Sequence, residues 1–295
     1  MSLPSPSAIF PHMVLSAEEI QRAVRAALAE DIGPGDVTTL ATVPESATTC
    51  AVMVAREPLV LAGLAFAVTA FRELERNLVI TPHVADGTQC PKGQILLRVT
   101  GAARAILTAE RVALNFVQRL SGVATRTAQF AEQVKGTRTK ILDTRKTTPG
   151  WRRFEKYAVK CGGGQNHRVG LYDMVLIKDN HLAALRHEQP NAIAAAVQRA
   201  LAAYPELKVE VEADTLEQVR QAVEARADII LLDNMRLDEL RAAVDLVGGR
   251  AQTEASGGVT LQTVSAIAET GVDFISVGAI THSARAVDVA LDFES

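Results

Sequence analysis

The order of hydrophobic and polar residues divides the chain into two parts with different rhythms. In the first part, Ser16 and Glu19 are predicted to form a capping box, and a helix is expected from there to about Glu30. Further helices are expected at 64–76 and 108–134. Short apolar or alternating runs bounded by turn-forming pairs predict three strands, at 50–55, 78–84 and 94–99. We therefore expect a small α+β layer in this part.

From Thr139 onward, short apolar runs alternate with segments of helical periodicity. Six runs have the composition of buried strands: 140–143, 174–177, 208–211, 229–232, 251–254 and 274–277. Asp214 and Glu217 are predicted to form a capping box, and Pro190 is predicted at the first position of a helix. Another helix is expected over Thr260–Gly271. This alternation predicts a parallel sheet, closed into a barrel or left open.

Length supports two domains. The chain has 295 residues, more than the roughly 250 of a typical single α/β barrel. We predict an α/β fold with an N-terminal helix and α+β sandwich domain over 1–120. An incomplete parallel α/β barrel is predicted over 121–279, and the segment 280–295 is expected to pack on the first domain.

Charge and cysteine content exclude several classes of protein. With 31 Lys and Arg against 34 Asp and Glu, the net charge of −3 argues against a nucleic-acid-binding protein. No apolar run reaches the roughly 18 residues that cross a bilayer, and residues 1–13 lack the basic start of a signal peptide. Three widely spaced cysteines without a CxxC pair favour neither disulfides nor zinc, so a cytoplasmic location is expected.

Polar or glycine-rich residues follow the end of every predicted barrel strand. They are Asp143-Thr-Arg-Lys146, Lys178-Asp-Asn-His181, Glu212, Asp233-Asn234, Ser256-Gly-Gly258 and Gly278-Ala279. In a parallel barrel the functional groups gather at this end of the strands, so we predict a pocket there. The period of two along its strand turns Glu212 inward together with Glu210, where a carboxylate needs a cation or a metal. Two alternatives stay open: Glu212 is a surface glutamate, and Asp233 caps a helix.

Positive charge is concentrated between Arg145 and Lys178, where eight Lys or Arg residues face two acidic ones. Those within 151–160 lie on a predicted helix, where part of the charge is a solvated face. The other four, Arg145, Lys146, Arg168 and Lys178, lie at a strand end or in the loop 162–168, where His167 adds a fifth basic residue. At an effective dielectric constant of about 20, a cation and a carboxylate about 4 Å apart attract by roughly 4 kcal/mol before desolvation. A cluster of five therefore predicts a polyanionic ligand, such as a dicarboxylate together with phosphates.

Two glycine turns follow the last two predicted strands. Ser256-Gly257-Gly258 precedes the helix expected at Thr260, so backbone N–H groups and a helix N-terminus can face an anion. Gly278 repeats this arrangement after the final strand, as in the phosphate site of many barrels. A single Ser-Gly-Gly is more often an ordinary turn, but the two turns together predict a phosphate site.

Another polar group lies before the predicted barrel. Arg111, Asn115 and Gln118 are spaced to form one stripe on the predicted helix, beside Val112 and Phe116. The residues alone favour a solvent-facing stripe.

Several longer motifs combine these residues into specific patterns. They are Asp31-Ile-Gly-x-Gly-Asp-x-Thr38, Glu110-Arg-x-Ala-Leu-Asn115, Leu120-Ser-Gly-x-Ala-Thr125, Asp143-Thr-Arg-Lys-Thr-Thr-Pro-Gly150, Gly162-Gly-Gly-x-Asn-His-Arg-x-Gly-Leu-Tyr-Asp173, Ile177-Lys-Asp-Asn-His181 and Glu254-Ala-Ser-Gly-Gly-Val259. These motifs resemble quinolinate phosphoribosyltransferase, a type II phosphoribosyltransferase, and the likeness extends from about Ser16 to the C-terminus. Trp151 departs from the leucine expected there and the 182–189 loop is slightly long, but neither touches a matched ligand position.

The resemblance implies an enzyme of NAD biosynthesis that works as a homodimer or larger homo-oligomer with shared sites. It would convert quinolinate and phosphoribosyl pyrophosphate into nicotinate mononucleotide, pyrophosphate and carbon dioxide, with Mg²⁺. The matched positions that would bind quinolinate are Arg145, Lys146, His167, Arg168 and Lys178, with Arg111 of the partner subunit reaching in.

Glu212 and Asp233 would serve the ribose and the Mg²⁺–pyrophosphate side, holding the metal directly or through water or pyrophosphate. Together with Lys146, these two carboxylates would be catalytic. The 5-phosphate would be held by Ser256, Gly257 and Gly278, with Gly258 as a further substrate-binding residue.

Other functions stay open from the residues alone. A phosphosugar lyase or aldolase would form a Schiff base on Lys178. An enzyme acting on nicotinate or another ring monoacid would leave buried cations unpaired, and a non-catalytic binding module gives no reason for inward carboxylates. Five histidines receive no predicted role: His12, His83, His181, His187 and His282.

Overall fold

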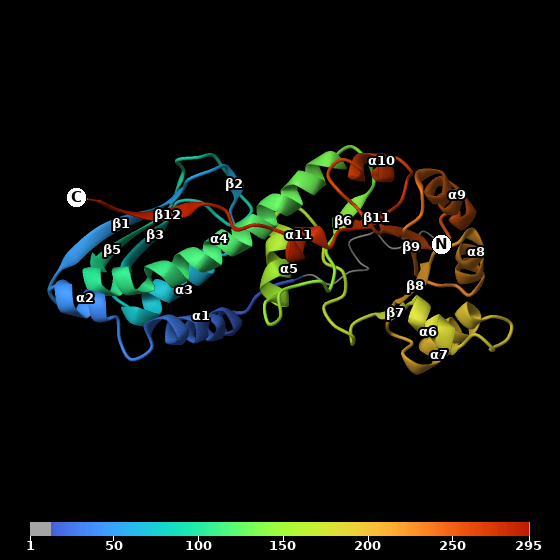
Figure 1. Ribbon diagram of the computed structural model, residues 1–295, viewed down its shortest axis with the longest axis horizontal. Helices are drawn as coiled ribbons and strands as arrows, with labels where there is room; N and C mark the ends of the chain where they lie inside the picture. Colours follow the sequence, from blue (N-terminus) through green and yellow to red (C-terminus); the bar gives the residue numbers. More distant parts are fainter. Residues whose placement is uncertain (1–12, 295) are drawn as a thin grey trace. The chain divides into compact units, whose positions relative to one another are not determined.

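The computed structural model describes residues 13–294; residues 1–12 and 295 lie outside the described part, as do His12 and most of the opening segment assessed for a signal peptide. The chain forms two compact units (Figure 1). In the described range, the antiparallel unit comprises Met13–Ala128, Arg153–Gly163 and 283–294, and the parallel unit comprises Gln129–Arg152 and Gly164–His282. Across residues 13–294, no helix has the combined length and apolar character needed to cross a membrane.

The antiparallel unit is built on a four-stranded sheet. Its strands, in spatial order, are β12 (Val289–Glu294), β1 (Thr48–Ala55), β5 (Ile95–Ala102) and β3 (Val79–Pro82). Two short strands, β2 (Leu59–Val60) and β4 (Gln89–Cys90), pair separately. The last strand of the chain lies antiparallel to the first, with Ala51 opposite Phe293 (Figure 1). The C-terminal segment thus completes the sheet of this unit.

Five helices accompany this sheet or connect it to the rest of the chain. They are α1 (Ala17–Ile32), α2 (Val37–Thr42), α3 (Leu64–Leu74), α4 (Ala103–Gln133) and α5 (Arg152–Cys161). The predicted capping box is confirmed, because the Glu19 N–H donates to the Ser16 hydroxyl and the Ser16 N–H donates to the Glu19 carboxylate. α4 begins earlier than the expected residue 108, because β5 leads directly into it and Ile106 is fully buried.

The parallel unit is an open α/β sheet, and the predicted fold class is confirmed. Its strands are β6 (Lys140–Leu142), β7 (Val175–Ile177), β8 (Val209–Ala213), β9 (Ile229–Asp233), β10 (Gln252–Ser256) and β11 (Phe274–Ser276). Their spatial order is β6-β11-β10-β9-β8-β7, and every pairing is parallel. The edges are β6 and β7, so the sheet is not a closed barrel.

The helices of the parallel unit are α6 (Asp179–Ala184), α7 (Ala192–Ala203), α8 (Leu216–Glu224), α9 (Leu237–Val247), α10 (Val264–Ala268) and α11 (Ala279–His282). Three predicted helix starts were wrong. α7 is capped by the Asn191 side chain rather than beginning at Pro190.

The capping box of α8 also lies one position further along than predicted. It pairs Thr215 with Gln218, because the Thr215 hydroxyl accepts the Gln218 N–H. The helix expected at 260 starts only at Val264. The Thr260 N–H donates to the Thr263 side chain and forms a turn before the helix.

Most buried residues of the parallel strands are apolar, but β8 and β10 also bury polar side chains, among them Glu210 and Glu254. Leu142, Met174, Ile229 and Phe274 form a buried cluster of the core. The strands therefore hold polar side chains at their ends in place, which determines where a site can form.

Candidate active site

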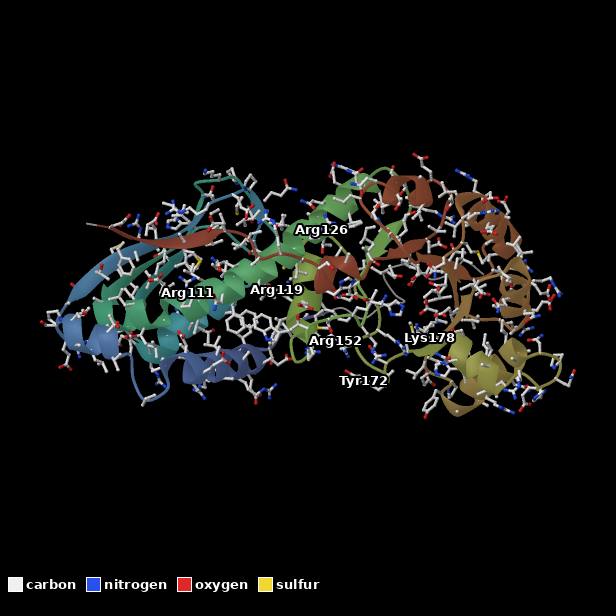
Figure 2. All side chains as sticks on the ribbon, viewed as in Figure 1. Arg111, Arg119, Arg126, Arg152, Tyr172 and Lys178 are labelled. Carbon is white, nitrogen blue, oxygen red and sulfur yellow. The ribbon has the colours of Figure 1, made fainter. Side chains whose placement is uncertain are left out.

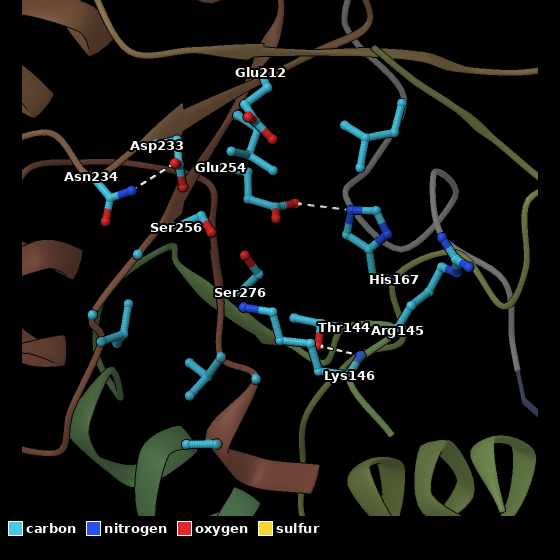
Figure 3. Close-up of a pocket in the computed structure, with 18 of the residues that line it drawn as sticks. Thr144, Arg145, Lys146, His167, Glu212, Asp233, Asn234, Glu254, Ser256 and Ser276 are labelled. Carbon is cyan, nitrogen blue, oxygen red and sulfur yellow. Dashed lines mark hydrogen bonds and ion pairs between the residues drawn. The ribbon is translucent and has the colours of Figure 1, made fainter. Parts of the chain in front are cut away.

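The carboxyl ends of the parallel strands line one cavity of about 740 Å³ (Figure 3). Eleven of the twelve predicted site residues line it: Arg145, Lys146, His167, Arg168, Lys178, Glu212, Asp233, Ser256, Gly257, Gly258 and Gly278. The twelfth, Arg111, is not among the lining residues. It is exposed and lies on α4 in the antiparallel unit (Figure 2).

The cations of the cavity differ in how well they are partnered. Lys178 Nζ lies 3.2 Å from Glu212 Oε2, and 48% of the Lys178 side chain is exposed. Arg168 is buried and donates to the Met174 carbonyl at 3.2 Å, and burial, together with neighbouring Arg145, lowers its pKa. Arg145 Nε is buried and has no hydrogen-bond partner among the residues described here. Because an unsatisfied buried donor is costly, the cavity favours an anionic ligand beside Arg145.

His167 is held by contacts at both of its ring nitrogens. Its Nδ1 accepts the Arg168 backbone N–H at 2.7 Å, so Nδ1 uses its lone pair. A neutral imidazole has one acceptor and one donor nitrogen, which places the proton on Nε2. Nε2 lies 3.0 Å from Glu210 Oε2 and 3.6 Å from Glu254 Oε2. This geometry fits a neutral imidazole rather than the cation that the count of positive charges assumed.

Beneath His167, Glu210 and Glu254 are completely buried. Burial raises the pKa of Glu210 to about 8, although the charge of Arg168 acts in the opposite direction. Burial and the neighbouring Glu210 raise the pKa of Glu254 to about 8. The two carboxyl groups therefore retain at least one proton near neutral pH.

His167, Glu210 and Glu254 also have the donor atoms of a metal site, within 4.8 Å of one another. A histidine that ligates a metal offers a lone pair from one nitrogen and carries a proton on the other. Here the second nitrogen accepts a backbone N–H, so Nε2 holds the proton and has no lone pair to offer. The cluster is thus better described as a proton-holding group than as a cation site.

The carboxylates suited to a cation lie at the ends of β8 and β9. Glu212 is paired with Lys178, and Asp233 accepts from the Asn234 amide at 2.6 Å. Magnesium prefers oxygen ligands and is usually held by one or two carboxylates together with substrate phosphates. The oxygen donors of Glu212 and Asp233 fit such an ion.

The glycine turn after β10 can offer backbone N–H groups to a ligand, but no helix begins there. Gly257 and Gly258 both have positive φ, 101° and 58°, but α10 does not begin until Val264. The predicted helix N-terminus at this turn was therefore wrong. Gly278 leaves room for neighbouring side chains, because an added Cβ would lie 3.1 Å from both Lys146 Cδ and the His282 ring.

Several residues of the site were missed by sequence reasoning. Glu254 and Ser276 line the cavity, and Asn234 lies beside Asp233 (Figure 3). His282 also belongs to the lining. A charged residue within the predicted strand 251–254 was an available signal for Glu254. Asn234 was noted at a strand end without a role, and nothing local distinguished His282.

An open parallel sheet whose strand ends bring cations, carboxylates and glycine turns into one cavity defines an α/β enzyme that binds acidic, phosphorylated ligands. The family models agree with this class. The N-terminal domain of quinolinate phosphoribosyl transferase matches residues 36–121, and its C-terminal domain matches residues 123–292.

Individual relatives match nearly the whole chain. It is 45% identical over 275 residues to nicotinate-nucleotide pyrophosphorylase [carboxylating] of Mycobacterium leprae (strain TN), covering 91% of this chain and 95% of that protein. It is 43% identical over 264 residues to the probable enzyme of the same name of Bacillus subtilis (strain 168), covering 89% of each. The solved nicotinate-nucleotide pyrophosphorylase of Francisella tularensis superposes with a TM-score of 0.91 at 41% identity, covering 97% of this chain and 100% of that one. The chain belongs to the quinolinate phosphoribosyltransferase family.

Proposed function

We propose that this chain transfers the phosphoribosyl group of phosphoribosyl pyrophosphate to the ring nitrogen of quinolinate. The adjacent carboxylate leaves as carbon dioxide, and the products are nicotinate mononucleotide and pyrophosphate. The observation that carries the proposal is the single cavity in which Arg145, Arg168 and Lys178 are gathered with the carboxylates of Glu212 and Asp233.

Quinolinate has two carboxylates next to each other on its ring, and the cavity offers cations for both. Arg145 has a buried Nε without a partner, and Arg168 is buried next to it. Lys178 supplies a third charge at the end of β7. A hydrogen bond to a charged group contributes about 1.5–3 kcal/mol, so two carboxylates bind substantially better than one. His167 contributes a fixed neutral ring rather than a further charge.

The carboxylates of Glu212 and Asp233 are assigned to the ribose. As pyrophosphate leaves, C1 of the ribose gains positive character, which Glu212 and Asp233 stabilise electrostatically. The pyridine nitrogen forms the new bond to C1. The substrate carboxylate next to the ring nitrogen then leaves as carbon dioxide, and the electron pair of the broken C–C bond stays on the ring carbon. The quaternised ring and the nearby cations stabilise this electron pair until the carbon takes up a proton. Lys146 is assigned to these cations as a catalytic residue, and the turns at Ser256–Gly258 and Gly278 hold the 5-phosphate.

A magnesium ion held by Glu212 and Asp233, directly or through water, would neutralise charge on the pyrophosphate. Their oxygen donors and their position in the lining of the cavity support this assignment.

We further propose a homodimer or larger homo-oligomer in which Arg111 of the partner subunit completes the quinolinate site. Arg111 is exposed within its own chain and absent from the lining of the cavity, as this arrangement requires. The free thiols of Cys50, Cys90 and Cys161 are compatible with a cytoplasmic location.

The test is an assay of the purified chain with quinolinate labelled in its C2 carboxylate. Labelled carbon dioxide should appear only with phosphoribosyl pyrophosphate and Mg²⁺, together with equimolar pyrophosphate and nicotinate mononucleotide. Release without the ribosyl donor, or equal use of nicotinate, would contradict the proposal. A phosphosugar lyase is the rival function: borohydride should then trap an adduct on Lys178, whereas the transferase forms none.

A further inference from the structure

Asn234, directly after β9, has an unusual backbone conformation. Its φ is 54°, and among residues 13–294 only one other non-glycine residue, Arg226 with φ 64°, has a positive value. Asparagine tolerates this left-handed region better than most residues because its short polar side chain can hydrogen-bond locally. The conformation alone would therefore explain an asparagine here, without any role for its amide.

The side-chain amide of Asn234, however, makes specific contacts. Its Nδ2 donates to Asp233 Oδ2 at 2.6 Å (Figure 3). The backbone N–H of Asn234 separately donates to the Ser256 carbonyl at 2.9 Å. The side-chain Oδ1 lies against Gly257, where an added Cβ would be only 2.1 Å away. One residue thus touches both the end of β9 and the turn that follows β10.

These two contacts link groups assigned to different parts of one ligand. Asp233 is assigned to the ribose and pyrophosphate side, and the turn at Ser256–Gly257 is assigned to the 5-phosphate. We propose that Asn234 is a positioning residue that holds the Asp233 carboxylate and the Ser256–Gly257 turn at the spacing of a bound phosphoribosyl pyrophosphate. This inference rests on the proposed function and adds to it a residue that sets affinity for the ribosyl donor.

Replacing Asn234 with glycine separates the role of the amide from that of the backbone. Glycine adopts positive φ readily, so Asn234→Gly keeps the turn and removes only the side chain. The dissociation constant of phosphoribosyl pyrophosphate with Mg²⁺, measured by calorimetry, should rise about 10- to 100-fold. This is the usual effect of losing a hydrogen bond that orients a metal-binding carboxylate, here that of Asp233. The dissociation constant of quinolinate and the melting temperature should stay unchanged.

Arg226→Gly is the matched control, because Arg226 has the same backbone conformation and does not line the cavity. It should bind both ligands as the parent chain does. Asn234→Asp keeps the shape of the side chain but loses the N–H donor and adds a second carboxylate beside Asp233. It should weaken donor binding at least as much as glycine does.

A double mutant tests the second contact. Gly257→Ala introduces a Cβ against the Asn234 amide, at a φ of 101° that alanine also tolerates poorly. In the Asn234→Gly background the amide is absent, so the added methyl group should cost less affinity for the ribosyl donor than it does in the parent chain. Additive losses of donor affinity in the double mutant would mean that Asn234 does not position the Ser256–Gly257 turn.

Unchanged donor affinity in Asn234→Gly would overturn the inference and leave the proposed function standing. An equal loss of affinity for quinolinate would overturn it as well, because it would show a general disturbance of the cavity. If the parent chain itself binds no phosphoribosyl pyrophosphate, the proposed function fails, and the inference fails with it.

Discussion

Glu254→Gln is the substitution that most directly tests the buried carboxyl pair. Glu254 is completely buried beside Glu210, within 3.6 Å of the His167 ring. Glutamine has nearly the same shape but is neutral at every pH. The substitution therefore removes one titrating group while leaving the packing of the cavity floor nearly intact.

The size of the effect follows from the pKa of Glu254. Burial raises it from 4.5 to about 8, so between these values the folded chain holds a proton that the unfolded chain releases. The stabilisation by this proton is complete below about pH 4.5 and is lost as the pH rises toward 8. While the folded chain holds one more proton than the unfolded chain, each unit of rising pH lowers the free energy of unfolding by about 1.4 kcal/mol. Between pH 4.5 and pH 7 the total loss for one carboxyl is at most about 3.5 kcal/mol.

The assay is urea unfolding followed by circular dichroism at about pH 5.5, 6.5 and 7.5. The free energy of unfolding of the parent chain should fall as the pH rises, and that of Glu254→Gln should fall less steeply. The difference in stability between the two proteins should therefore shift in favour of the variant as the pH rises. Glu217→Gln serves as control, because hydrogen bonds from Arg220 lower the pKa of the exposed Glu217 and keep it ionised throughout this range. Equal slopes for the parent chain and Glu254→Gln would refute the reasoning.

Two further predictions concern assembly and folding. Inactive Arg111→Ala and Lys146→Ala chains, mixed in equal amounts, should regain about a quarter of the parent activity, because half of random dimers then hold one intact site; no recovery in verified mixed dimers would show that Arg111 does not act across an interface. Asp86→Ala should lower the free energy of unfolding by about 1–3 kcal/mol, since its carboxylate accepts the N–H groups of Gly63 and Leu64 at the start of α3. Thermal unfolding measures this loss, and an unchanged melting temperature would contradict it.

Local signals in the sequence predicted the features that depend on neighbouring residues. The capping box of Ser16 and Glu19 is complete within one helical turn, so the structure confirms it. The apolar runs of most parallel strands are also local signals, because strands buried on both faces are rich in apolar residues. β10 is an exception, since it buries Glu254 within a mostly polar strand. Their carboxyl ends meet in any parallel sheet, which is why the residues predicted there line one cavity.

Features that depend on tertiary contacts could not be read in the same way. The pairing of His167 with Glu210 brings a loop onto the middle of a strand distant in sequence. The tautomer of His167 depends on the direction of one backbone N–H group, which no residue pattern specifies. The contact of Asn234 with Gly257 depends on the register in which β9 pairs with β10. Two helix starts were misplaced because neighbouring residues are also common at helix starts: Pro190 at a first helical position beside Asn191, and Asp214 as a cap beside Thr215.

On this account the cations of the cavity neutralise a ring with two adjacent carboxylates. The most direct measurement compares the dissociation constants of quinolinate and nicotinate for the purified chain by calorimetry. Losing one charge-assisted hydrogen bond of about 1.5–3 kcal/mol corresponds to about 10- to 100-fold, so quinolinate should bind tighter by at least that factor. Equal affinities, or tighter binding of nicotinate, would contradict the claim.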